Sequence, residues 1–74
     1  MRDEVKKVLE NAFPDIDFEG SDELVDGGIL DSITIVGIVS ELSMEFGIEI
    51  PYEEIIPENF NSLDGLASLV EKYQ

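Results

Sequence analysis

The chain has 74 residues, which allows one small core, so we expect a single domain over residues 1–74 without a large built-in active site. It has no His and no Cys, which removes the usual nucleophile and base pairs and thiolate metal sites and argues against an enzyme. With 18 acidic and 4 basic residues the net charge is −14, which disfavours nucleic acids and anionic membranes and favours partners with basic patches.

The first residues carry apolar side chains at helical spacing, which predicts a helix from residue 2 to residue 13. The residues on this spacing are Val5, Val8, Leu9, Ala12 and Phe13. Pro14 is expected to end the helix, because proline lacks an N–H and restricts the residue before it. The segment is too polar for a signal peptide, and no apolar run has the length of a membrane span. We therefore expect a cytoplasmic protein without membrane insertion, and the acidic surface charge favours a monomer.

Residues 14–31 combine many acids with a proline and three glycines, which predicts a long loop. Loops of this length are uncommon in small domains and are often functional. We expect its apolar side chains to anchor it to the core. These are Ile16, Phe18, Leu24, Val25, Ile29 and Leu30.

Residues 15–26 of this loop nearly fit a calcium-binding loop, with Gly20 at position 6. The candidate ligands are Asp15, Asp17, Glu19, Ser21, Glu23 and Asp26. The match is poor at position 8, where Asp22 replaces an apolar residue, and at position 12, where aspartate replaces a bidentate glutamate. A solvated acidic loop is the simpler interpretation. An acidic module that binds divalent ions without a covalent cofactor stays open as a distant alternative function.

The most apolar stretch predicts a second helix from residue 32 to residue 46, closed by Gly47 in a left-handed conformation. Its expected core face comprises Ile35, Val39, Leu42 and Phe46, flanked by Val36 and Ile38. The opposite, solvent side comprises Ile33, Gly37, Ser40 and Met44, with Thr34, Glu41 and Glu45 alongside. Glycine in a helix interior lowers helix stability. Two explanations for Gly37 stay open: close approach by a partner, or tolerance of glycine at a surface position.

Residues 48–61 are expected to form an extended connector, because Pro51 and Pro57 leave room for about one helical turn. Ser62 then caps a last helix. Its apolar face comprises Leu63, Leu66, Ala67, Val70 and Tyr73. The predicted fold class is all-α: a small four-helix bundle of three main helices and one short helix, with a long loop between the first and second.

The segment GGILDSIT, residues 27–34, places Ser32 at the start of the second helix. Either Asp31 or Ser32 can cap this helix, because either side-chain oxygen can accept a free N–H of the first turn. The same position exposes the serine, and a phosphate attached to it would face the positive end of the helix dipole. These residues by themselves leave capping and attachment open.

GGILDSI resembles the phosphopantetheine attachment motif of acyl carrier proteins, with Ile33 in place of the usual leucine. The similarity continues through EFGIEIP and PENFNSLDGLASLVEKY and so covers essentially the whole chain. It implies that Ser32 carries 4′-phosphopantetheine, attached by a phosphopantetheinyl transferase that uses magnesium and coenzyme A. Asp31, the motif neighbour, would help to position the magnesium or the serine. The thiol of the arm would hold acyl or aminoacyl groups as thioesters, with no resident metal.

The resemblance also implies that partner enzymes with basic patches dock on the second helix. The docking residues would be Ile33, Ser40, Glu41, Met44 and Glu45. Thr34, Gly37 and Ser43, however, stand where carriers of fatty acid biosynthesis often have acids. This less acidic face and the PENFNS segment also resemble free-standing aminoacyl, peptidyl or D-alanyl carriers that serve adenylate-forming ligases. Both a synthase of lipid metabolism and such a ligase therefore stay open as the loading enzyme.

Overall fold

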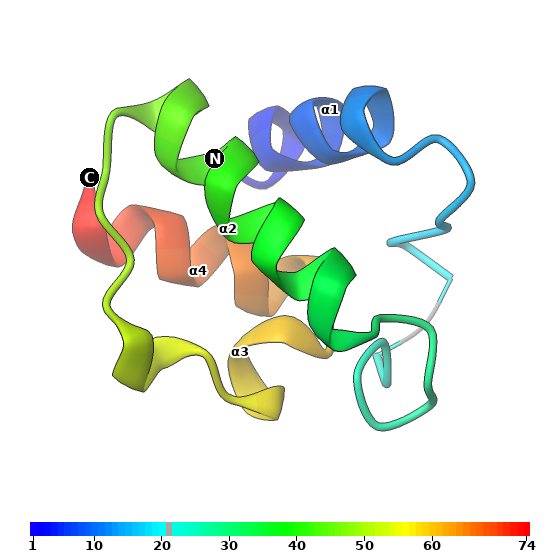
Figure 1. Ribbon diagram of the computed structural model, residues 1–74. Helices are drawn as coiled ribbons and strands as arrows, with labels where there is room; N and C mark the ends of the chain where they lie inside the picture. Colours follow the sequence, from blue (N-terminus) through cyan, green and yellow to red (C-terminus); the bar gives the residue numbers. More distant parts are fainter. Residues whose placement is uncertain (21) are drawn as a thin grey trace.

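The computed structural model describes residues 1–20 and 22–74, and the regular elements in these two stretches are all helical. α1 spans Arg2–Ala12, α2 spans Ser32–Phe46, α3 spans Pro57–Phe60 and α4 spans Leu63–Tyr73, with a 3₁₀ turn, η1, at Tyr52–Glu54. Figure 1 shows α2 crossing the front of the molecule, with α1 above it, α3 below it and α4 behind. The all-α fold and the long loop between α1 and α2 are confirmed.

The helix ends lie where the local sequence signals place them. α1 stops one residue before Phe13, which directly precedes Pro14. Gly47 ends α2 in the left-handed conformation, with φ 63°, and its N–H donates to the carbonyl of Ser43. Ser62 caps α4, because its hydroxyl oxygen accepts the N–H of Gly65 at 3.0 Å. None of the helices in the described stretches is long and apolar enough to cross a membrane.

The core lies where α4 packs against α1 and α3, and α1 packs against α2. Its buried side chains come from every α-helix, from the long loop and from the segment after α2: Val5, Leu9, Phe18, Leu24, Leu30, Ile38, Leu42, Ile48, Phe60, Leu63, Leu66, Ala67, Leu69 and Val70. Burying one large aliphatic or aromatic side chain stabilises a fold by about 1.5–3 kcal/mol. The loop residues Phe18, Leu24 and Leu30 therefore hold the loop against the helices, as the sequence predicts.

Two apolar residues expected in or near the core are exposed. Ile29, predicted as a loop anchor, is 45% exposed, because the N–H of Leu30 donates to the carbonyl of Leu24 and this turn directs the two leucines inward. Val36, predicted beside the core face of α2, is 62% exposed. It lies two residues from the fully buried Ile38, and a two-residue step turns a helix by about 200°. The core face of α2 is centred nearer Ile38 and Leu42 than predicted.

Gly37, expected on the solvent side of α2, is partly covered by the ring of Phe13. A Cβ atom added there would lie 3.0 Å from Cζ of Phe13, so the aromatic ring occupies the space that a side chain would need. The ring of Phe13 also packs edge-on against Phe18, with ring centroids 6.5 Å apart. The missing side chain at Gly37 thus lets the end of α1 and the start of the long loop approach α2.

Candidate functional site

Asp31 caps α2. Its backbone is extended, its Oδ1 accepts the N–H of Thr34 at 2.8 Å, and its carbonyl accepts the N–H of Ile35 at 2.9 Å. The hydrogen bond from the Thr34 N–H lowers the pKa of the Asp31 carboxyl, because it stabilises the ionised form. The structure thereby separates the two roles that the sequence left open, since the capping oxygen belongs to Asp31 and not to Ser32.

Ser32 is the first residue of α2, and its side chain is exposed. Within residues 1–20 and 22–74, no hydrogen bond joins its hydroxyl to another group. The hydroxyl therefore stands at the positive end of the α2 dipole without a structural partner. A phosphate ester at this oxygen would be accessible to an enzyme and favoured by the dipole, so the position fits a phosphate-linked group.

Residues 24–26, which lie several positions before Ser32, are hydrogen-bonded to Asn61 at the junction of α3 and α4. Asn61 Oδ1 accepts the N–H groups of Val25 and Asp26 at 2.9 and 3.0 Å, and its Nδ2 donates to the Asp26 carboxylate at 3.0 Å. Its carbonyl also accepts the N–H of Leu24 at 2.9 Å. Gly28, with φ 80°, then turns the chain towards α2. Local sequence patterns do not predict this role of Asn61, because its partners lie 35 to 37 positions earlier.

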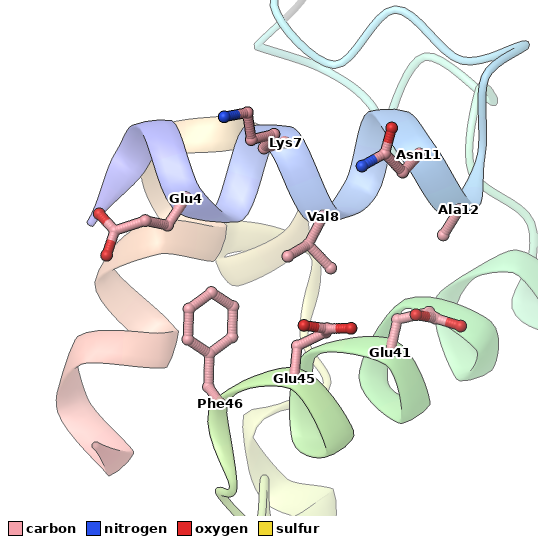
Figure 2. A pocket seen from close by; sticks show the side chains of 8 residues that line it. All are labelled: Glu4, Lys7, Val8, Asn11, Ala12, Glu41, Glu45 and Phe46. Atoms are coloured by element: carbon pink, nitrogen blue, oxygen red, sulfur yellow. The ribbon is translucent and has the colours of Figure 1, made fainter.

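Three predicted docking residues, together with Val36, share the solvent face of α2. Ile33 is 84% and Met44 is 74% exposed, and Val36 and Ser40, which lie between them, are also exposed and carry no charge. We call this set the uncharged stripe: Ile33, Val36, Ser40 and Met44. Glu41 and Glu45, also predicted for docking, lie apart from it on the side of α2 that faces α1 (Figure 2). The structure therefore divides the predicted docking face into an apolar part and an acidic edge.

Several carboxylates of the calcium-like loop have partners within the protein. Asp17 Oδ1 accepts two loop N–H groups, Glu19 forms ion pairs with cations of α1 that include Lys6, and Asp26 bonds to the asparagine described above. Ser21, the candidate at position 7, lies outside the described residues. Among the described residues, no group of three or more acidic side chains is arranged to hold a metal ion. These contacts support the interpretation as a solvated, structural loop.

A small helical bundle that presents an exposed serine at a helix start is the architecture of a carrier domain. The family model described as "phosphopantetheine attachment site" matches residues 1–70, and the chain belongs to this family of carrier proteins. Its members carry 4′-phosphopantetheine covalently on a serine, interact with phosphopantetheinyl transferases and partner enzymes, and are not catalysts themselves. The resemblance found in the sequence is thus confirmed. No curated protein and no solved structure matches the chain.

Proposed function

We propose that Ser32 is the residue to which 4′-phosphopantetheine is attached. The observation that carries the proposal is the division of roles at the start of α2, where Asp31 caps the helix and the Ser32 hydroxyl stays exposed. Other serines are less suited. Among the residues that the structure describes, the Ser62 hydroxyl caps α4, and Ser40, Ser43 and Ser68 lie inside helices, away from the positive end of a dipole.

The protein's own residues present the attachment point. The Ser32 oxygen would form a bond to the phosphorus that carries the pantetheine arm of coenzyme A, the pyrophosphate bond would break with 3′,5′-ADP as the leaving group, and the serine proton would pass to a base of the transferase. The Asp31 carboxylate, of which Oδ1 is occupied by the cap, would use Oδ2 to position magnesium or the serine in the transferase complex. When bound, the group supplies a thiol on which acyl groups are held as thioesters. The chain has no cysteine, so it has no other thiol that could form a thioester.

We further propose that the cargo is an acyl group, delivered to partner enzymes with basic docking patches. A small apolar pocket of about 150 Å³ lies beside α2 and α3, and one of its residues, Ile35, is three positions after Ser32. The pocket is lined by Val25, Ile35, Ile55, Ile56, Pro57 and Phe60. Such a lining supports an apolar cargo. The uncharged stripe favours, as a second candidate, an aminoacyl, peptidyl or D-alanyl carrier that serves an adenylate-forming ligase.

The attachment site is tested by incubating the protein with coenzyme A, magnesium and a broad-specificity phosphopantetheinyl transferase, followed by intact-mass measurement. We expect one phosphopantetheine group on the wild type and none on Ser32→Ala. Ser68→Ala removes an exposed serine from α4, outside the predicted docking face, and should still be modified. The assignment to Ser32 fails if the wild type gains no mass or if Ser32→Ala is still modified.

The cargo is tested on protein isolated from its native cells. Hydroxylamine cleaves thioesters and converts the released groups to hydroxamates, whose masses identify them. Fatty acyl hydroxamates are expected for the acyl carrier, whereas amino acid hydroxamates would replace this proposal with the second candidate.

A further inference from the structure

Glu54 lies in η1 and is the centre of a set of hydrogen bonds that joins η1 to α3 and α4. Its Oε2 accepts one hydrogen bond from the Tyr73 hydroxyl and one from the Lys72 ammonium, each at 2.5 Å. Nδ2 of Asn59 donates to Glu54 Oε1 at 3.2 Å and to the Glu54 carbonyl oxygen at 2.8 Å. The bonds from Lys72 and Tyr73 lower the pKa of the Glu54 carboxyl, because they stabilise its ionised form. We call these four residues the Glu54 hub.

The hub holds a segment that buries little apolar surface of its own. This segment, residues 49–59, includes η1 and most of α3, and we call it the strap. None of its residues, all of which the structure describes, is buried, whereas Ile48 and Phe60 on either side of it are. Ile50 and Ile55 are only partly buried. Because the stabilisation from apolar burial scales with the area removed from water, the strap needs the polar hub to fix its position.

The strap forms one wall of the apolar pocket of about 150 Å³ beside α2. Ile55, Ile56 and Pro57 line the pocket from the strap, whereas Val25 and Ile35 line it from the long loop and α2. Ile56 is 40% exposed and Ile35 is only partly buried, so closing the pocket would remove more of their apolar surface from water. The hydrophobic effect favours such closure. A pocket that stays open therefore needs a restraint on its walls.

We propose that the Glu54 hub holds the strap away from α2 and thereby keeps the apolar pocket open for an apolar group. The hub ties the strap to α4, whereas among the described residues no hydrogen bond or ion pair joins the strap to α2. A preformed pocket binds its ligand more tightly, because the cost of ordering its walls does not fall on the binding step.

Glu54 and Tyr73 are thus positioning residues, which act through the strap and do not line the pocket. The kind of ligand, the apolar part of a carried acyl group, rests on the proposed function. The role of the hub does not, because opening of the pocket involves neither Ser32 nor an attached group. A probe that is not a substrate can therefore test the hub separately.

The probe is benzene, because apolar pockets of about 150 Å³ that are lined by aliphatic and aromatic side chains take it up. The Kd is measured on the full chain by NMR, from the methyl signals during a benzene titration. We expect shifts in the wild type at Val25, Ile35 and Ile55, which line the pocket. All variants are compared at a temperature at which circular dichroism shows them to be folded.

Two variants break the hub from opposite sides. Tyr73→Phe removes the hydroxyl and keeps the ring, and Glu54→Gln keeps the side-chain size and removes the charge. Each should weaken benzene binding about fivefold, and either one tests the proposal if the other does not fold. The double variant should lose little more than a single one, because both changes break the same set of bonds. Glu53→Gln removes an exposed charge next to the hub and should leave the Kd unchanged.

Two further variants separate the hub from other effects. Val8→Ala removes two methyl groups from a partly buried side chain of α1, outside the pocket, so it lowers stability without changing the strap. Its Kd for benzene should equal that of the wild type. Ser32→Ala should also bind benzene like the wild type, so failure of the attachment proposal and failure of the hub proposal give different results.

Several outcomes would overturn the proposal. Absence of benzene binding to the wild type, or an unchanged Kd in both hub variants, would show that the hub does not keep a pocket open. Tighter binding in the hub variants would show that the hub instead holds the strap shut. An equal loss in Val8→Ala would assign the effect to general stability, and an equal loss in Glu53→Gln would assign it to diffuse charge.

Discussion

Replacing Asn61 by alanine removes three side-chain hydrogen bonds that join the loop before α2 to the start of α4. The N–H of Val25 is partly buried and would lose its acceptor, whereas the groups of Asp26 can turn to water. A hydrogen bond in a protein contributes about 0.5–1.5 kcal/mol net, and an unsatisfied buried donor costs about 1–3 kcal/mol. We therefore expect Asn61→Ala to lower the free energy of unfolding by about 2 kcal/mol.

In a domain of this size, that loss corresponds to a decrease in Tm of roughly 8–16 °C, measurable by circular dichroism during thermal and urea unfolding. Asn11→Ala is the matched control, because Asn11 is exposed on α1 and alanine slightly favours the helix. Asn61→Asp keeps an acceptor but places a second carboxylate against Asp26, so its stability should recover partly in acid. The reasoning is refuted if Asn61→Ala unfolds within about 0.5 kcal/mol of the wild type.

Three further predictions concern electrostatics. Asp31→Ala should lower Tm by a few degrees and Asp31→Asn much less. Because the pKa of Asp31 is lowered, its stabilisation is present above the ordinary carboxyl pKa and lost as pH falls through the lowered value, which acid unfolding of wild type and Asp31→Asn checks. The Tyr73 hydroxyl donates to Glu54 at 2.5 Å, which raises the pKa of Tyr73, so its stabilisation is lost only as pH rises through the raised value. Ultraviolet titration should give a lower Tyr73 pKa in Glu54→Gln. Added salt or magnesium should raise Tm, because it screens a net charge of −14, and an unchanged or lower Tm would count against this explanation.

Local signals predicted the helices of this protein well. Pro14, Gly47 and Ser62 act on the backbone within one or two residues, so their effects can be inferred from the neighbouring sequence alone. The contact between Gly37 and Phe13 could not be predicted in this way, because it depends on how α1 lies across α2. The periodicity of α2 predicted that one face is buried, but not which residues lie at the centre of that face. Val36 was therefore predicted beside the core, although it is exposed.

The sequence predicted Asp31 and Ser32 as candidate residues but did not assign the helix cap to one of them. Asp31 and Ser32 both have an oxygen within reach of the first turn, and only the positions of the atoms assign the cap to Asp31. The docking face was predicted as one surface, because helical periodicity places Glu41 and Glu45 beside Met44. The packing of α1 on α2 divides that surface, since Glu41 and Glu45 lie on the side of α2 that faces α1 (Figure 2).

The position of Ser32 is set by neighbours that act on the backbone from both sides. Asp31 holds the first turn of α2, and Asn61 holds the chain several residues earlier, while the Ser32 hydroxyl contributes no hydrogen bond within the described residues. Replacing Ser32 by alanine should therefore leave the fold and its stability nearly unchanged. Failure of Ser32→Ala to accept phosphopantetheine would then report the loss of the attachment oxygen and not the loss of the folded carrier.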